Sequence, residues 1–446
     1  MEEEDSFFLN QENRALKDEN QQLRRRLAAK RYKAIDRVVD SVYKIVPKPR
    51  RKSKPTTSKK VSMPRKVEAG RVDLINHNFY DWDGKVLYRG GAERYVYDLA
   101  VLLRSLGYSP RILQGAKKGF QKMYRGIPVI GVQTQVKPGN YRGLSRLYNK
   151  VCREAEFIIA SPNELASDID GIPCIAINHG VNFDGIWTTS TYSPMELYAQ
   201  QTDSIINSDC CVCVDTNFIN WMRTKDYMLS QKLVYIPNYY DQRSFHERVR
   251  ANKDDRIVFV YPRRIYEPRG YDITIKAFRK VLAEHPEIEL RLVGQFDNDR
   301  VKADVEAFIA EFPKNVSHEE YPMEEAYRAY DGADVILVPT RYSEGTSLSC
   351  IEGQAAGLPV IATNIGGLPN LILDHFNGLL IAPTAKALER AVLELVENPK
   401  LRKEMGRHSL EVAKSSFEKH LWDKRWTDVI KEFGKQENRS EKPKTE

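Results

Sequence analysis

The chain has 446 residues, of which 41% are hydrophobic, and its 69 Lys and Arg against 61 Asp and Glu give a formal net charge of +8. This length supports two hydrophobic cores, because a single core rarely grows beyond about 250–300 residues. No stretch reaches the roughly 20 apolar residues of a membrane-spanning helix, and the acidic, polar N-terminus is unlike a signal peptide. We therefore expect a cytoplasmic protein that does not cross a membrane.

The positive charge is concentrated in an N-terminal arm. Residues 1–70 contain 19 Lys and Arg but only 10 Asp and Glu, so the remainder of the chain is close to neutral. Leucine recurs there every seventh residue, and asparagine follows two of these leucines by four positions (Leu9, Asn13, Leu16, Asn20, Leu23). Buried Asn at such positions favours a parallel two-stranded coiled coil. The pattern predicts a short coiled coil over residues 1–30 and a homodimer through residues 9–27, with a single solvated helix as the alternative.

Residues 31–70 follow with an amphipathic helical pattern and then a basic strip. Between Lys44 and Lys66 there are ten Lys and Arg and no acidic residue, with four prolines that interrupt any helix. A basic amphipathic helix followed by a polybasic strip suits an anionic membrane surface, which we expect residues 31–66 to bind at the inner face of the cell membrane. Nucleic acid and a solvated linker are the alternatives, and we expect no nucleic-acid partner because no aromatic stacking pattern accompanies the charge.

From Arg71 onward, short apolar runs alternate with helical patterns. The predicted strands of this half are "RVDLINHNF", "IPVIGV", "EFIIASP", "PCIAINHG", "SDCCVCVD" and "LVYIPN". The helix after "RGGAERY" presents Val96, Leu99, Leu103 and Leu106 on one face, and Gly107 is a natural stop. Strands that alternate with helices indicate a parallel, doubly wound sheet, so residues 71–245 are predicted to form one Rossmann-like domain.

Residues 256–415 show the same alternation of short apolar runs and helical patterns, which predicts a second Rossmann-like domain. Its predicted strands are "RIVFVYP", "IELRLVGQ", "DVILVPT" and "LPVIATN". Residues 416–433 are predicted to form a final helix that crosses back to the first domain, and residues 434–446 a disordered tail. The fold class is therefore α/β, with two doubly wound Rossmann-like domains facing a cleft, and ligands are expected beyond the carboxyl ends of the strands.

The segment "DCCVCVD" (Asp209–Asp215) contains three of the six cysteines. It lacks the C-x-x-C spacing and the nearby histidine of a metal or redox cluster. We therefore interpret it as a buried strand with small apolar thiols, and we keep the metal or redox cluster as the alternative.

The stretch "RYSEGTSLSCIEGQAAGLPVIATNIGGLP" carries the first candidate site. Glu344 lies just beyond the predicted strand that ends at Thr340, and Thr346 or Ser347 can cap the helix that follows. The free N–H groups and dipole of such a helix start suit a diphosphate. Glu352 lies further along this helix, and two carboxylates that accept hydroxyl hydrogen bonds suit a sugar and a ribose. An ordinary capped helix with two surface acids is the alternative.

Other polar residues also follow predicted strands. The loop after the first predicted strand of the second half contains three arginines, Arg263, Arg264 and Arg269. Their guanidinium groups can bind phosphate oxygens, and a solvated loop is the alternative. Gly90 and Gly91 allow backbone N–H groups to approach a phosphate or a sugar, or they form a plain turn. His179 follows a strand and should face the same cleft, although a lone histidine is often structural.

Together these residues resemble the family-four retaining glycosyltransferases of GT-B fold, from about Arg71 to Phe433. The resemblance rests on the Gly-Gly loop, the strand followed by His-Gly, "IPNYYDQRSF", Arg-x4-Arg-Gly, and Glu-x7-Glu with "EGQAAGLPVIATNIGGLP". It implies that residues 71–245 bind the acceptor and residues 256–415 the nucleotide sugar. Within the second domain, it implies that Glu344 contacts the donor sugar, Glu352 the ribose, and Arg264 and Arg269 the diphosphate. It further implies a catalytic role for His179 and a loop beside the phosphates and the acceptor for Gly90 and Gly91. The remaining residues that it assigns to donor binding are Gly294, Gly345, Thr346, Ser347 and Leu348.

The chain departs from the family pattern at several positions. Arg269 stands where Lys is usual, Gly345-Thr346-Ser347 where Gly-Phe-Gly is common, Asn370 where an acid is frequent, and Tyr239 where Gly follows "IPN". These departures bear on which donor the protein uses more than on which type of reaction it catalyses. The resemblance implies no metal and no cofactor besides the nucleotide sugar as co-substrate.

The sequence thus predicts a retaining glycosyltransferase that moves a sugar from a nucleoside-diphosphate sugar to an acceptor hydroxyl. A glycan or lipid-linked acceptor, such as a precursor of a cell-surface polysaccharide, is expected because of the basic arm. The alternatives are a nucleotide-sugar epimerase of the same architecture and a non-catalytic, dimeric, membrane-associated scaffold.

Overall fold

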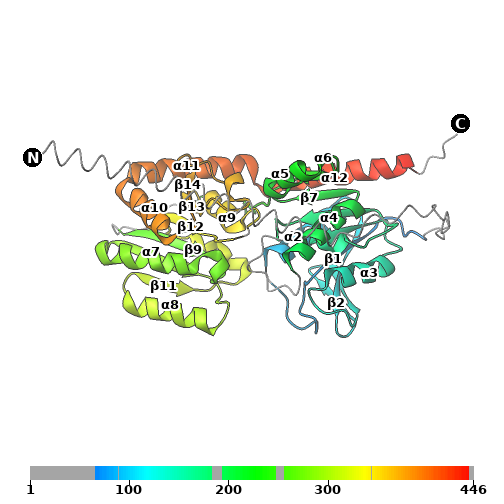
Figure 1. The fold of residues 1–446 in the computed structure, drawn as a ribbon, viewed down its shortest axis with the longest axis horizontal. Coiled ribbons are helices and arrows are strands. Elements are labelled where there is room, and N and C mark those ends of the chain that lie inside the picture. The colour runs from blue at the N-terminus through cyan, green and yellow to red at the C-terminus, as the bar shows by residue number, and fades with distance from the viewer. Residues whose placement is uncertain (1–65, 89, 183–192, 248–255, 343, 441–446) are drawn as a thin grey trace, which may run out of the picture. The chain divides into compact units, whose positions relative to one another are not determined.

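The computed structural model describes residues 66–440 except Arg89, Ser343 and the segments 183–192 and 248–255. The coiled coil predicted for residues 1–30, the homodimer contact at residues 9–27 and the membrane-binding strip at residues 31–66 lie almost entirely outside this part. Residues 65–446 form one compact unit that contains two parallel sheets and the helices that cover them (Figure 1). Among the described helices, none is both long enough and apolar enough to cross a membrane.

The first domain is built on a sheet of eight strands in the order β3-β4-β2-β1-β5-β6-β7-β8. Every pairing in it is parallel except β3 with β4, which is antiparallel. The strands are β1 (Arg71–Asn76), β2 (Ser109–Ala116), β3 (Phe120–Tyr124), β4 (Ile127–Gln133), β5 (Phe157–Ser161), β6 (Cys174–Asn178), β7 (Cys210–Cys213) and β8 (Leu233–Tyr235). The helices are α2 (Gly91–Ser105), α3 (Tyr141–Val151), η1 (Asn163–Ala166), α4 (Pro194–Asn207), α5 (Thr216–Lys225) and α6 (Tyr227–Ser230).

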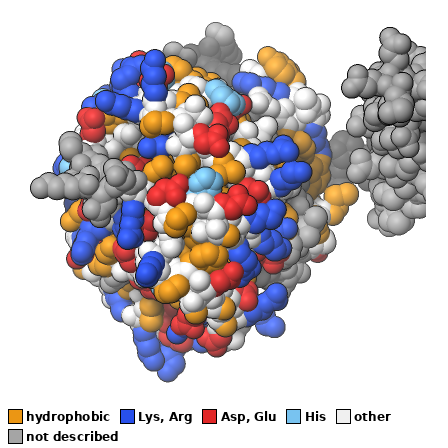
Figure 2. Space-filling model, turned by 90° about the vertical axis from the view of Figure 1, so that its left-hand side faces the viewer, with side chains coloured by type: hydrophobic (Ala, Val, Ile, Leu, Met, Phe, Trp, Pro, Cys, Tyr) orange, Lys and Arg blue, Asp and Glu red, His pale blue; other side chains and the backbone are white. Residues whose placement is uncertain are grey.

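The second domain has a fully parallel sheet of six strands in the order β11-β10-β9-β12-β13-β14. The strands are β9 (Ile257–Pro262), β10 (Ile288–Val293), β11 (Val316–Glu319), β12 (Val335–Val338), β13 (Val360–Thr363) and β14 (Gly378–Ile381). The helices are η2 (Glu267–Arg269), α7 (Tyr271–Glu284), α8 (Asp299–Glu311), η3 (Met323–Tyr330), α9 (Leu348–Ala355), η4 (Leu368–Asn370), α10 (Ala385–Glu397), α11 (Pro399–Ser416) and α12 (Lys419–Ser440). On the face of this domain seen in Figure 2, basic and acidic side chains are interspersed and hydrophobic ones are scattered.

The predicted fold class is confirmed, and the differences from the sequence analysis concern particular elements. Strands β2, β3, β11 and β14 were not identified from the sequence. The antiparallel β3 pairs with the edge of a sheet that is otherwise parallel, and its alternating half-buried and exposed residues give only a weak apolar signal. The helix face around α2 is confirmed: Val96, Leu99 and Leu103 are buried, and Gly107 follows the helix with a φ of +93°.

The cysteine-rich segment forms β7, as the sequence predicted. Cys211 and Cys213 are buried, Cys210 is half-buried, and all six cysteines of the chain are free thiols. Burial raises the pKa of the Cys210 thiol to about 12, so this thiol is protonated and unreactive at neutral pH. Within the described residues, no group of three His, Cys, Asp or Glu is arranged to hold a metal ion.

The chain crosses between the two domains at two points that are bonded to each other. The backbone N–H of Tyr240 donates to the carbonyl of Phe417 at 2.9 Å, and the N–H of Lys419 donates to the carbonyl of Tyr240 at 3.0 Å. Helix α12 then packs Trp422, Trp426 and other apolar side chains into the core of the first domain. It continues to Ser440, so residues 434–440, predicted to be disordered, are helical, because a single glycine does not stop an otherwise favourable helical sequence. The rest of the predicted tail, residues 441–446, lies outside the described residues.

We predict that Trp426→Ala lowers the free energy of unfolding by about 3–5 kcal/mol, because it leaves a cavity in the first core. The indole is fully buried, and its Nε1 donates to the hydroxyl of Tyr95 at 2.8 Å. Urea unfolding of the variant measures the change. The control is Lys424→Ala, at an exposed position of the same helix, which should change the free energy by less than about 0.5 kcal/mol. Equal effects of the two substitutions would contradict the packing of α12.

Candidate active site

A cleft of about 930 Å³ lies between the loops that follow the strands of the two sheets. Its first wall carries His179 and Gly180, directly after β6, and its second wall carries Arg264 and Arg269, after β9, and Glu344, after β12. All of these residues lie at the carboxyl ends of parallel strands, where ligands bind in doubly wound folds. The structure therefore brings His179, Arg264, Arg269, Glu344 and Gly345, all selected from the sequence, to one cleft.

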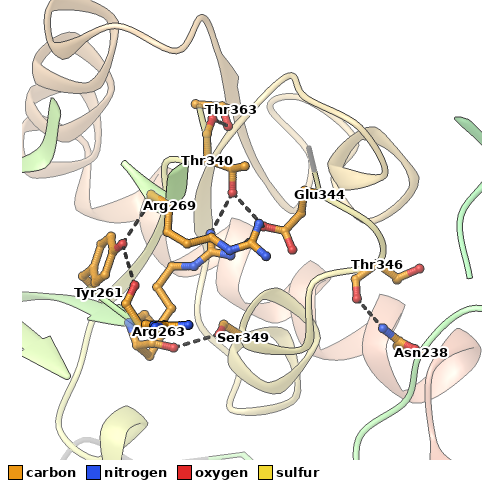
Figure 3. A network of polar contacts seen from close by, with 11 residues as sticks. Asn238, Tyr261, Arg263, Arg269, Thr340, Glu344, Thr346, Ser349 and Thr363 are labelled. Atoms are coloured by element: carbon orange, nitrogen blue, oxygen red, sulfur yellow. Dashed lines mark hydrogen bonds and ion pairs between the residues drawn. The ribbon is translucent and has the colours of Figure 1, made fainter. Parts of the chain in front are cut away.

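The carboxylate of Glu344 is the centre of a buried polar cluster (Figure 3). Its Oε2 accepts hydrogen bonds from Arg263 Nη2 at 2.5 Å, Arg269 Nη1 at 2.7 Å and Thr340 Oγ1 at 2.8 Å. Burial by itself would raise the pKa of Glu344, but the charges of Arg269 and Arg263 outweigh burial and hold the pKa below its ordinary value. The carboxylate is therefore ionised at neutral pH and fixed in orientation.

The three arginines after β9 have different positions. Arg263 is buried and also donates from Nη1 to Thr340 Oγ1 at 2.8 Å. Arg264, which the resemblance selects with Arg269, is largely exposed and pairs with Asp297 at 2.7 Å. Arg264 and Arg269 nevertheless flank the same ring of Tyr266, with centroid distances of 5.2 Å and 5.8 Å. Arg264 thus lies at the cleft surface, whereas Arg263, which the resemblance left without a role, supports Glu344.

Glu352, on α9, has partners that the sequence analysis did not identify. Its Oε1 accepts from Arg94 Nη2 at 2.9 Å, and its Oε2 accepts from the hydroxyl of Tyr330 at 2.9 Å. Arg94 belongs to α2 of the first domain, so this ion pair joins the two domains. Burial would lower the pKa of Arg94, but the Glu352 carboxylate more than compensates and raises it. No local pattern could have indicated this pair, since 258 residues separate its members.

The start of α9 lacks the side-chain cap predicted from Thr346 or Ser347. Ser347 occupies the N-cap position without a side-chain hydrogen bond to the helix. The Thr346 hydroxyl instead donates to the carbonyl of Val214 in the first domain, and its own carbonyl accepts from Asn238 Nδ2 at 2.6 Å. The cap prediction is therefore wrong, because an inter-domain contact takes the hydroxyl. The first N–H groups of α9 consequently have no side-chain partner from the N-cap residue, as an anion site requires.

Glycines permit the close approach of backbones around this helix start. A Cβ at Gly91 would lie 2.7 Å from Cδ1 of Leu348, so the starts of α2 and α9 touch. A Cβ at Gly345 would lie 2.6 Å from the carbonyl oxygen of His179, and one at Gly294 would lie 2.4 Å from that of Arg263. Gly90 is the N-cap of α2, and its N–H donates to Glu93 at 2.9 Å. The glycines selected from the sequence thus lie at contacts that a larger residue would disrupt.

His179 lies against the loop of Glu344 and Gly345. Its Nε2 is 2.9 Å from the Ser161 hydroxyl, and its ring packs edge-on against Tyr95, with the centroids 5.5 Å apart. Burial lowers the pKa of His179 to about 4. The imidazole is therefore neutral at physiological pH and acts there as a hydrogen-bonding group, not as a cation.

Comparisons with known proteins agree with this geometry. Residues 241–411 match the family model described as "Glycosyl transferases group 1". An uncharacterized glycosyltransferase of Methanocaldococcus jannaschii is 28% identical over 223 residues, which cover 49% of this chain and 57% of that protein. A D-inositol 3-phosphate glycosyltransferase of Corynebacterium diphtheriae is 29% identical over 164 residues, which cover 35% of this chain and 38% of the relative. The chain thus spans about half the length, or less, of these curated relatives.

Solved structures show the same fold over most of the chain. Sucrose-phosphate synthase from Thermosynechococcus elongatus superposes with a TM-score of 0.67 at 18% identity, covering 82% of this chain and 99% of that one. The Anabaena protein Alr3699/HepE, solved in complex with UDP, superposes with a TM-score of 0.62 at 16% identity, covering 81% and 99%. The fold is therefore that of the GT-B glycosyltransferases. The match of residues 241–411 to the model of the group 1 glycosyltransferases agrees with the resemblance at the level of that broad group.

We predict that Glu344→Ala destabilises the protein by about 3–5 kcal/mol, because it leaves the guanidinium groups of Arg263 and Arg269 close together without their counter-charge. Guanidinium unfolding at neutral pH measures the loss. Glu389→Ala is the control, because its pair with Lys280 is at the surface and should contribute less than about 1 kcal/mol. A loss for Glu344→Ala as small as that of the control would show that the cluster does not hold the carboxylate.

Proposed function

We propose that the protein is a retaining glycosyltransferase that transfers a sugar from a nucleoside-diphosphate sugar to an acceptor hydroxyl. The observation that carries this proposal is the ionised Glu344, held by Arg263, Arg269 and Thr340, in the same cleft as the neutral His179. The family match of residues 241–411 supports the reaction class. The complex of Alr3699/HepE with UDP-glucose supports a nucleotide sugar as the donor.

The second domain would hold the donor. The start of α9 and the guanidinium groups of Arg264 and Arg269 offer N–H donors and positive charge to a diphosphate. Glu352 would accept hydrogen bonds from the ribose hydroxyls. Its two oxygens already accept from Arg94 and Tyr330, so the ribose must either use the remaining lone pairs or displace Arg94. Glu344 would accept hydrogen bonds from the donor sugar.

In the reaction, the bond between the anomeric carbon and the diphosphate oxygen breaks, and the acceptor oxygen forms a new bond to the same face of that carbon. The leaving diphosphate takes the proton of the acceptor hydroxyl, so that the transfer needs no covalent intermediate with the protein. Arg264, Arg269 and the start of α9 stabilise the negative charge that develops on the diphosphate. Glu344 and the carbonyl and ring of His179 surround the sugar as it becomes cationic. These protein groups supply the stabilisation, and we propose that no metal ion is required.

The first experiment is a panel of nucleotide sugars, with release of the free nucleoside diphosphate as the readout. We expect slow release from one donor in the absence of acceptor, and a loss of about 100-fold or more in Arg269→Ala, because a guanidinium next to the leaving group is missing. Arg264→Ala should raise the KM for the donor, because this arginine lies at the surface of the cleft.

The matched control is Arg279→Ala, since Arg279 pairs with Glu311 on an exposed face of α7 and should leave the release unchanged. An Arg269→Ala variant with the activity of this control would contradict the placement of the diphosphate. Inversion at the anomeric carbon, observed by NMR of the first product formed, would contradict retention. Conversion of the donor into an epimer without transfer would favour the epimerase alternative, and binding without turnover would favour the scaffold.

A further inference from the structure

The two walls of the cleft differ in charge. The second-domain wall carries three arginines, Arg264, Arg269 and Arg300, and it is the wall to which we assign the diphosphate. On the first-domain wall, none of the described residues is Lys or Arg. Its histidines, His77 and His179, are neutral at physiological pH, since burial lowers the pKa of each to about 4. An anionic group on this wall would therefore find no described counter-charge from the first domain.

Hydrogen-bond acceptors without donors are gathered on the same wall. Glu164 Oε2, Asn182 Oδ1 and Gln201 Oε1 are buried and have no hydrogen-bond partner among the described residues. The other polar atoms of these side chains are used: Asn182 Nδ2 donates to Glu164 Oε1, and Gln201 Nε2 donates to the carbonyl of Gly180 at 3.1 Å. A buried acceptor that lacks a donor is unfavourable, because it has lost its hydrogen bond to water. Three such oxygens on one wall call for donors that the described residues do not supply.

Beside these oxygens, two rings offer an apolar surface. The rings of His77 and Tyr141 lie with their centroids 5.1 Å apart at an angle of 55°, and both line the cleft. Nδ1 of His77 is buried and also has no partner. Ligand sites commonly combine such apolar surfaces with a few fixed polar groups. A pyranose ring matches this combination, since it presents C–H groups on its faces and hydroxyl donors at its edge.

We propose that the first-domain wall, formed by His77, Tyr141, Glu164, His179, Asn182 and Gln201, is the acceptor subsite and that it takes an uncharged, polyhydroxylated sugar. The inference rests on the proposed glycosyl transfer and adds the substrate class. Hydroxyl groups donate to the three unpaired oxygens. A phosphate or carboxylate at the same place brings further acceptors and a negative charge next to the Glu164 carboxyl group, without any described cation of the first domain to offset them.

The test uses the wild-type protein with the donor identified by nucleoside-diphosphate release. Methyl α-D-glucoside, methyl α-D-mannoside and methyl α-D-galactoside are each compared with their 6-phosphate counterparts, and myo-inositol with inositol 3-phosphate. We expect at least one neutral compound to accelerate release above the background and to yield a glycosylated product by mass spectrometry. Its phosphorylated counterpart should be poorer by roughly tenfold or more in kcat/KM.

Two results would overturn the inference: no acceleration by any neutral compound, or a phosphorylated counterpart that is the better acceptor. Neither result bears on the proposed function, because donor cleavage without acceptor is measured separately and depends on Arg269. Absence of that background cleavage with every donor, together with absence of any product, would instead count against the proposed function itself.

A substitution that adds charge gives a second, internal readout. Asn182→Lys places an ammonium group next to the unpaired oxygens, so the ratio of phosphorylated to neutral acceptor use should rise by roughly tenfold. Asn220→Lys, at an exposed position of α5 in the first domain, adds the same charge away from the cleft and should leave the ratio unchanged. Equal ratios in the two variants would overturn the assignment of this wall, and because a ratio is measured, a partial loss of folded protein does not affect the result.

Discussion

The site depends above all on the clamp that holds one carboxylate between two arginines. Glu344 follows a buried strand, and Arg263 and Arg269 reach it from the loop of the neighbouring strand β9. An ionised group so deeply buried is stable only when its charge is matched and its oxygens are hydrogen-bonded. The clamp thereby fixes the loop that carries Gly345, and the backbone of His179 in the first domain lies directly against that glycine.

From this loop outward, the two domains meet through residues of the proposed donor site. Arg94 binds Glu352, Thr346 binds the backbone of Val214, and Gly91 touches Leu348. A diphosphate that binds at the start of α9 would therefore lie next to the contacts that hold the two domains together. Away from the site, the two segments that connect the domains are also bonded to each other, at Tyr240 and Phe417.

The sequence indicated the elements and the loops well, because buried parallel strands give continuous apolar runs and their carboxyl ends are easy to locate. It could not show that Arg263 contacts Glu344, because adjacent residues at a strand end point in opposite directions and one step of register exchanges them. The family pattern assigned Arg264 and Arg269 to the diphosphate and gave no role to Arg263, whereas the structure gives Arg263 a buried contact with Glu344. Likewise, Thr346 has the chemistry of a helix cap, but a tertiary contact with Val214 overrides that local preference. The unpaired oxygens of Glu164, Asn182 and Gln201 come from three separate elements, so only the folded chain brings them together.

The most direct measurement is a crystal structure of the protein with a nucleoside diphosphate bound. We expect the diphosphate at the start of α9, with Arg264 and Arg269 against its oxygens. We expect the ribose hydroxyls on the Glu352 carboxylate, with the contact between Glu352 and Arg94 shared or released. A nucleotide bound elsewhere, with the Glu344 clamp and the Arg94–Glu352 pair untouched, would contradict the assignment of this cleft as the donor site.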